Sequence, residues 1–572
     1  MTTREGLWQA ILDRPGDELA RLIYADWLEE HGETVRAEFI RVQVRLAKLR
    51  QDDPEYVALQ ERQRELLIVH GRGWVEEYPA WMQEWGVRWR GGFLGEFQLS
   101  AERFLRSGGT LRRAAPVVAL HLTQVRNQAK KVGQSPWLAG VQELNLVGGE
   151  LNPDDLAELL ASPHLGQVRS LWLEHNRVGV KGARHLARWP GLAQLEELSL
   201  RFNKIRDEGL AILLGSPHLG SLQELVLHGN RLTSAAGRIL AACDRLGSLR
   251  KLDLGLARLG SEGMEHLSRA EALGGLESLN LRVALVGNAG VRWLTEGRWV
   301  ESLREVDLNR NLLEEEAGQM LAQSHRLRLR RLQLGHNRLG DAGVRWLARA
   351  AALRTVRELD LRGNGLTDTG VECLAEGTLA ELEELRLGFD HCTVAGVMRL
   401  LTAKQLPRLQ GLEWYRDETL DLVGLAECPG LQRLGSLTLS ARDVANDGLE
   451  RLAASPWLPH LRSLSLNGMP VRLTVMAALA SNLRLGQLEE LSLAGTELGD
   501  PGAQLLAESV SLGRLTYLDL AHNRIGPVGA AALASAPGLT RLLALNVAGN
   551  PLDTASLQRL RRRFGIDVVV TR

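Results

Sequence analysis

Cysteine is scarce in this sequence, and long hydrophobic runs are absent. The 572 residues include four cysteines and no CxxC pair, which argues against a disulfide-stapled scaffold and indicates small buried side chains in a reducing compartment. No apolar run reaches the roughly 18 residues of a membrane span, and the N-terminus has none of signal-peptide length. We therefore expect a cytoplasmic protein without a membrane segment.

An excess of charge of either sign is also missing. The 69 basic residues balance 69 acidic ones, which argues against a general nucleic-acid or membrane-surface binder, since such proteins are normally basic. The hydrophobic fraction of 45% is typical of a folded protein, but the chain is too long for one ordinary globular core. Several domains or a repeat architecture must therefore divide the core.

The short motifs of common catalytic sites are absent as well. We find no GxxxxGK[ST] loop, no HExxH, no GxSxG elbow and no EF-hand loop. Histidines His175, His336 and His522 each precede an asparagine, and we expect them to be exposed at a rim and not to bind metal. The sequence thus predicts a protein that is not an enzyme and that uses no cofactor or metal.

A repeat fills most of the chain. The stretch "LTYLDLAHNRI" from Leu515 to Ile525 follows the pattern L-x-x-L-x-L-x-x-N-x-L, and copies recur about every 27 residues. Sixteen units begin at Val141, Val168, Leu195, Leu222, Leu249, Leu276, Leu303, Leu329, Val356, Leu382, Leu409, Leu434, Leu461, Leu488, Leu515 and Leu542. In-register copies of this number indicate a leucine-rich repeat.

Each part of the unit has a physical reason. The L-x-L segment alternates with period two, so it predicts a short strand with one buried face. The asparagine that follows can satisfy backbone groups that the turn leaves unpaired; it is kept at Asn176, Asn203, Asn230, Asn311, Asn337, Asn364, Asn523 and Asn550. Where neighbouring units lack it, we expect looser turns: Ala257, Ala284, Arg442, Met469 and Thr496.

The second half of each unit has helical spacing. Val344, Leu347 and Ala348 fall on one face of a helix, as do Leu210 and Leu213 with the leucine that follows. Stacked units bury the apolar faces that one unit cannot, and helices need more room than strands, so the stack should bend. The predicted fold is an α/β solenoid, a horseshoe with a parallel sheet on the concave face and helices on the convex face.

Units of this length with a full helix resemble the ribonuclease-inhibitor class of leucine-rich repeat. That class also includes the GTPase-activating protein of nuclear transport and the sensor regions of innate-immune receptors. The resemblance covers residues 141–556 and implies a fold, but it does not imply a partner.

Residues 1–86 differ from the array and contain amphipathic helical segments, with Gly32 and Gly71 expected at helix C-caps. The segments "RLIYADWLEEHG" and "RAEFIRVQ" resemble a bacterial repeat-companion domain, which implies a bacterial origin. We assign residues 1–86 to this α-helical domain, 87–140 to an N-terminal cap with a degenerate first repeat, 141–556 to the repeats and 557–572 to a C-terminal cap. The N-terminal cap should contain a hairpin or edge strand followed by a helix. In the C-terminal cap, Val568–Val570 should add a final strand.

The side chains that project from the concave strands are the candidate binding residues. The residue between the strand leucines and the two after them should face the inside of the horseshoe, and exposed aromatic and arginine residues are typical of interface hot spots. The predicted partner-binding residues are Trp172, Glu174, Arg201, Phe202, His228, Arg282, Asp307, Arg310, Asp360, Arg362, Arg386, Phe389, Glu413, Tyr415 and Arg416.

These residues predict a non-catalytic scaffold that binds a protein partner through the concave face, with no nucleic-acid partner expected and the oligomeric state left open. An alternative, by analogy with the ribonuclease-inhibitor class, is a regulator of an enzyme, either an inhibitor of a hydrolase or an activator of a small GTPase. A third alternative is an enzyme that uses the acids of the N-terminal helices, Asp26 and Glu29.

Overall fold

The computed structural model describes residues 3–49, 53–83, 86–444, 447–509, 511–564 and 568–570. The chain divides into two compact units. Unit 1 runs to Ala257 and includes Ala270–Gly275; unit 2 comprises Arg258–Arg269 and the chain from Leu276 onward. Part of the predicted C-terminal cap, 565–567 and 571–572, lies outside the described residues.

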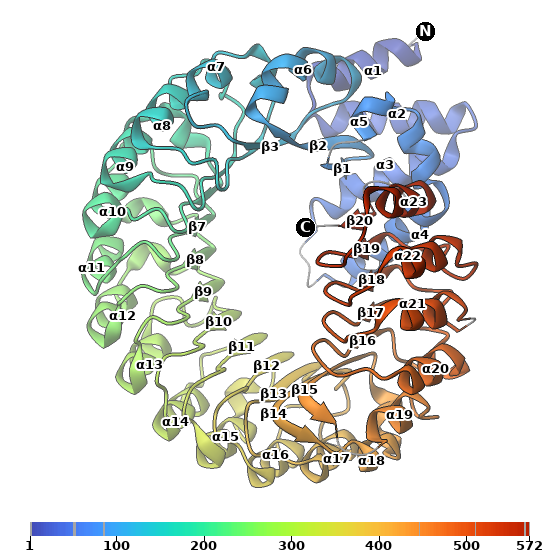
Figure 1. Cartoon of the computed structure of the whole chain (residues 1–572). Helices are drawn as coiled ribbons and strands as arrows, with labels where there is room; N and C mark the ends of the chain where they lie inside the picture. The colour runs from blue at the N-terminus through green and yellow to red at the C-terminus, as the bar shows by residue number, and fades with distance from the viewer. Residues whose placement is uncertain are drawn as a thin grey trace. The chain divides into compact units, whose positions relative to one another are not determined.

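Unit 1 contains a helical N-terminal part followed by stacked strand–helix repeats (Figure 1). Its helices are α1 (Arg4–Asp13), α2 (Glu18–Glu30), α3 (Thr34–Leu46), α4 (Pro54–Glu76), α5 (Ala80–Gln83), α6 (Ala101–Ala114), α7 (Ala129–Gly133), α8 (Pro153–Leu160), α9 (Gly179–Arg188), α10 (Arg206–Leu214) and α11 (Ala235–Ala241). Its strands are β1 (Gly86–Arg90), β2 (Phe93–Ser100), β3 (Ala119–Thr123), β4 (Glu143–Asn145), β5 (Ser170–Trp172), β6 (Glu197–Ser199), β7 (Glu224–Val226) and β8 (Lys251–Asp253). β1 and β2 are antiparallel, and β2 to β8 pair in parallel in chain order.

Unit 2 continues the same alternation. Its strands are β9 (Ser278–Asn280), β10 (Glu305–Asp307), β11 (Arg331–Gln333), β12 (Glu358–Asp360), β13 (Glu384–Gly388), β14 (Gly411–Leu420), β15 (Ser436–Val444), β16 (Ser463–Ser465), β17 (Glu490–Ser492), β18 (Tyr517–Asp519), β19 (Ala544–Asn546) and β20 (Val569–Val570). Its helices are α12 (Gly260–Ser268), α13 (Gly287–Glu296), α14 (Glu315–Gln323), α15 (Gly340–Ala348), α16 (Asp368–Ala375), α17 (Val394–Thr402), α18 (Val423–Ala426), α19 (Gly448–Ala453), α20 (Leu473–Ser481), α21 (Gly499–Ala507), α22 (Pro527–Ser535) and α23 (Thr554–Phe564). Neighbouring strands pair in parallel, and β20 pairs with β19 as the predicted final strand.

The core of each unit lies between its sheet and its helices. Strands line the inner face and helices lie outside them in both units (Figure 1). The register repeats the sequence period, so that Leu279 of β9 stands opposite Val306 of β10. The strand leucines are buried, and so are Val344, Leu347 and Ala348 of α15, as their helical spacing predicts. The solenoid predicted from the repeat is therefore confirmed.

The repeat asparagines bond across to the preceding repeat as well as within their own turn. The Asn311 side chain is fully buried; its Oδ1 accepts the N–H groups of Ala284 and Val286, and its Nδ2 donates to the carbonyl of Leu281. Asn337 does the same one repeat later. Because each side chain satisfies groups of two repeats, the asparagines form a ladder that holds the turns in register.

Turns that lack the asparagine differ from one another. At Thr496 the expected loosening is wrong, because the buried hydroxyl donates to the Leu493 carbonyl and to Oδ1 of Asn523. β14 and β15 instead continue past the point where other strands end, and Leu420 stands opposite Val444. The turn expected near Arg442 is thus replaced by paired extended backbone.

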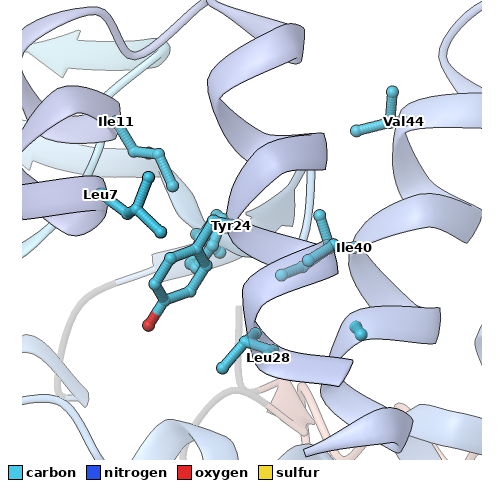
Figure 2. Close-up of a cluster of buried hydrophobic side chains, with 9 residues drawn as sticks. Leu7, Ile11, Tyr24, Leu28, Ile40 and Val44 are labelled. Atoms are coloured by element: carbon cyan, nitrogen blue, oxygen red, sulfur yellow. The ribbon is translucent and has the colours of Figure 1, made fainter. Parts of the chain in front are cut away.

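The N-terminal helices form a small core of their own. Side chains of α1, α2 and α3 gather between these helices (Figure 2), and the labelled members are Leu7, Ile11, Tyr24, Leu28, Ile40 and Val44. Gly32 has a φ of +85° just after α2, as expected for a C-cap. The C-cap prediction at Gly71 is wrong, because α4 continues to Glu76. Among the described helices, none has both the length and the apolar character needed to cross a bilayer.

Two buried arginines join these helices to the β1–β2 hairpin. Arg21 donates to the carbonyls of Pro15, Arg90 and Gly91, and burial lowers its pKa to about 10. The Arg36 guanidinium lies 4.6 Å from the centre of the Trp74 ring, and its pKa is also lowered by burial. The N-terminal helices are therefore packed on the first strands of unit 1.

Candidate partner-binding surface

The turn after each inner strand places one residue in the left-handed region of backbone space. This turn position stands one place before the asparagine of the repeat. Glycine fills it, with φ from +63° to +71°, at Gly148, Gly229, Gly363, Gly468, Gly495 and Gly549. Larger side chains occupy it at φ from +55° to +60° in His175, Phe202, Leu256, Val283, Arg310, His336, Phe389 and His522.

Large side chains at the turn position carry a conformational cost. A residue with a Cβ atom loses about 1–2 kcal/mol in the left-handed region, which glycine does not. Strain of this kind persists where the surroundings hold it and concentrates at functional sites. Phe202 and Phe389, both predicted to bind a partner, occupy this strained position.

In unit 1 the aromatic residues gather around Phe202. Its ring centre lies 4.7 Å from that of His175 and 5.4 Å from that of His228, and the Arg201 guanidinium lies 5.2 Å from it. The Nδ1 atom of His228 is 3.3 Å from a carboxylate oxygen of Asp253. One ring thus bridges side chains from successive repeats.

Trp172 and Glu174 lie one repeat earlier on the same inner face. Trp172 of β5 stands opposite Ser199 of β6, and the Ser199 hydroxyl donates to Glu174 at 2.9 Å. Both predicted residues are half-buried. We call the group Trp172, Glu174, His175, Arg201, Phe202, His228 and Asp253 patch 1.

In unit 2 the charged side chains form an internally paired network. Arg362 donates twice to Asp360, at 2.9 and 2.7 Å, which raises the pKa of its guanidinium. Arg386 donates to one oxygen of Glu413 at 2.8 Å, and the Tyr415 hydroxyl donates to the other at 3.0 Å. Burial and the neighbouring Glu413 carboxylate raise the pKa of Tyr415. The network leaves little uncompensated charge.

This network supports an exposed aromatic surface. Phe389 is 43% exposed, and its ring stacks on Tyr415 with centres 5.7 Å apart and planes 13° apart. His336 lies on its other side at 5.5 Å, and the Arg362 guanidinium is 5.3 Å from the Tyr415 ring centre. We call the group His336, Asp360, Arg362, Arg386, Phe389, Glu413 and Tyr415 patch 2.

The remaining predicted residues lie outside these two patches. Arg282 and Arg310 are exposed, whereas Asp307 of β10 is half-buried and accepts the Asn309 N–H at 2.8 Å. Arg416 of β14 donates to the Cys392 carbonyl at 2.6 Å, which ties it to the preceding repeat.

Two predicted contact residues are buried, although the inner column was expected to face solvent. His228 is 7% exposed beneath Phe202, and Asp360 is 2% exposed beneath Arg362. Both therefore position their neighbours in the free chain. His175 and His522 are exposed, as expected of rim residues, and His336 is half-buried. His175 and His336 also contact the rings of Phe202 and Phe389, and glycine at the equivalent place in six other repeats is the sequence signal for this turn position.

The described part of the chain offers no arrangement for metal chemistry. It contains no group of three or more His, Cys, Asp or Glu side chains that could hold a metal ion. Asp26 and Glu29, the acids considered for a catalytic role, both pair with Arg41, at 2.7 and 2.6 Å. These ion pairs give both acids a structural role between α2 and α3.

A family model described as Leucine Rich repeat matches residues 194–213, 248–268, 329–348, 352–375, 488–507 and 515–534. These six segments are similar to leucine-rich repeats. The matched segments fall in both units and coincide with strand–turn–helix repeats of the solenoid. The comparison with curated proteins found no match to this chain.

Solved structures similar to this chain include proteins of bacteria and yeast. An LRR protein of Leptospira interrogans is 19% identical, with 77% of this chain and 97% of that chain covered and a TM-score of 0.31. The structure of the Rad7 and Elc1 complex in yeast is 18% identical, covers 80% of this chain and 90% of that chain, and has a TM-score of 0.37. The internalin inlF of Listeria monocytogenes is 18% identical, covers 72% of this chain and 87% of that chain, and has a TM-score of 0.25.

Proposed function

We propose that this chain is a non-catalytic recognition scaffold that binds a protein partner through patches 1 and 2 on the inner faces of its units. The observation that carries the proposal is the pair Phe202 and Phe389, the two aromatic centres of the patches, which hold large rings at a left-handed turn position where six repeats have glycine. A ring at this position costs conformational energy, and the proposed contact with a partner is the gain that we set against that cost.

The composition of the patches supports a protein partner. Aromatic and arginine side chains dominate interface hot spots, and rigid aromatic groups lose little conformational entropy on binding. In patch 2 the ion pairs of Arg362 and Arg386 hold the rings of Tyr415 and Phe389 in place before binding. A preorganised aromatic surface with compensated charge favours recognition of a protein over electrostatic binding of a polyanion.

The test replaces the strained rings by the residue that other repeats use. Capture of partners from an extract of the source cells is compared between the wild-type chain, a Phe202→Gly/Phe389→Gly variant and a His522→Gly control. His522 occupies the same turn position outside both patches, so the control makes the same backbone change. Partners should be lost from the double variant and kept by the control; equal capture by both would overturn the proposal.

A further inference from the structure

A third exposed group lies at the turns that follow β9 and β10 in unit 2. Leu285 and Leu312 are 48% and 55% exposed, and both have a φ of +58°. They occupy equivalent places in adjacent repeats, one residue after the asparagine position. Other repeats with positive φ at this place have glycine or a charged side chain there: Glu150, Lys204, Arg231, Gly365, Glu497 and Arg524. Two large apolar side chains therefore stand in solvent at backbone positions that disfavour them.

The asparagine ladder fixes these leucines in place. The N–H groups on either side of Leu285 both bond to Oδ1 of Asn311, and those on either side of Leu312 both bond to Oδ1 of Asn337. The distances are 2.8–3.1 Å. The two side chains are thus presented by a rigid turn, at about the spacing of neighbouring strands, roughly 4.8 Å.

Positive charge surrounds this apolar pair. The equivalent places in the flanking repeats carry Arg258 and Arg338, and Arg282 and Arg310 precede Leu285 and Leu312 by three and two residues; all four arginines are exposed. Within the described residues, Arg282 and Arg310 form no ion pair, whereas Arg338 has Glu314 4.0 Å away. Burial and the charges of Arg310 and Arg362 lower the pKa of nearby His336, with a further contribution from Arg282.

We infer that this surface, defined by Arg282, Arg310, Leu285 and Leu312, takes an acidic segment of a protein partner that seats an apolar side chain across the two leucines. Carboxylates complement the unpaired guanidinium groups, and guanidinium–carboxylate pairs are frequently bidentate. A nucleic acid would satisfy the arginines but would leave the leucines without a complement. The inference rests on the proposed function, since it names the chemistry of a segment that the scaffold recognises.

Binding of short fluorescent probes to the full chain tests the inference by fluorescence anisotropy. The probes are a glutamate–leucine peptide, a glutamate–serine peptide, a lysine–leucine peptide and oligothymidine. The glutamate–leucine peptide should bind best, and added salt should weaken it. A Leu285→Gly/Leu312→Gly variant should bind it at least about tenfold more weakly, and so should Arg282→Gln/Arg310→Gln.

The control is Arg524→Gly, which makes the same change at the equivalent place of a distant repeat, where φ is +57°. It should bind the glutamate–leucine peptide as the wild-type chain does. The inference is overturned if no probe binds, if the glutamate–serine peptide binds equally well, or if oligothymidine binds more tightly. These probes require no natural partner. If none of them binds, but the Phe202→Gly/Phe389→Gly variant still loses its partners in the capture experiment, this inference is wrong and the proposed function stands.

Discussion

At an ordinary strand or helix position, an alanine variant is more stable than a glycine variant. At Phe389 we expect the opposite order, with Phe389→Gly more stable than Phe389→Ala. Alanine retains the left-handed cost of about 1–2 kcal/mol, whereas glycine removes it and adds about 0.5–1 kcal/mol of unfolded-chain entropy. Both variants lose the contacts of the ring with Tyr415 and His336 equally. The glycine variant should therefore be more stable than the alanine variant by about 0.5–1 kcal/mol.

Native-state hydrogen exchange measures this difference where it arises. The Phe389 N–H donates to the Tyr415 carbonyl at 2.9 Å, so exchange at residue 389 reports opening of the turn. Exchange should be about two- to fivefold slower in Phe389→Gly than in Phe389→Ala. Gly468→Ala is the control, since φ is +71° and a Cβ there meets no atom within 4 Å; its turn should open more easily. Equal exchange in the two Phe389 variants would refute the strain argument.

Three further predictions concern the asparagine ladder, a histidine and the N-terminal core. Asn311→Ala should destabilise unit 2 by about 2–4 kcal/mol, because it leaves several buried backbone groups unpaired; urea unfolding would show the lower midpoint, and an unchanged midpoint would contradict the ladder. Because the pKa of His336 is lowered in the folded chain, its contribution to stability is complete above about pH 6.5 and is lost as pH falls toward the folded pKa. Arg310→Gln should raise the pKa of His336, which an NMR titration would measure. Arg21→Met should leave carbonyls of the β1–β2 turn unpaired, so limited proteolysis should release the N-terminal helices sooner than in the wild-type chain.

The solenoid could be predicted because every repeat places its leucines in the same environment. The spacing from Leu515 to Ile525 predicted the strand β18 and the turn after it, and each further copy repeated the evidence. The parallel sheet nevertheless begins before the first clear repeat, since β2 pairs with β3 and Phe97 stands opposite Leu120. The expected hairpin or edge strand is present as β1 and β2. That β2 also belongs to the parallel sheet was not predicted, because Phe97 stands in place of the first strand leucine.

The inner-face residues could be predicted as a column but not as groups. Alternation along a strand shows which residues face inward, but the pairing of Arg386 with Glu413 joins side chains 27 residues apart and depends on side-chain conformation. Burial of Asp360 follows from the fold of Arg362 over it, which alternation cannot show. The prediction at Gly71 was wrong because glycine marks a helix end only as a tendency, and α4 continues through it to Glu76.

The energy that maintains the exposed leucines comes from the same bonds that stack the repeats. Each buried hydrogen bond contributes about 0.5–1.5 kcal/mol, and two such bonds to Asn311 flank Leu285. Their sum is comparable to the 1–2 kcal/mol cost of a leucine at positive φ, so the turn holds its conformation at little net cost. Glycine would give the same turn without the cost, as Gly365 does in another repeat. Stability alone therefore does not explain Leu285 or Leu312, and this is why we propose that they contact an apolar side chain of a partner.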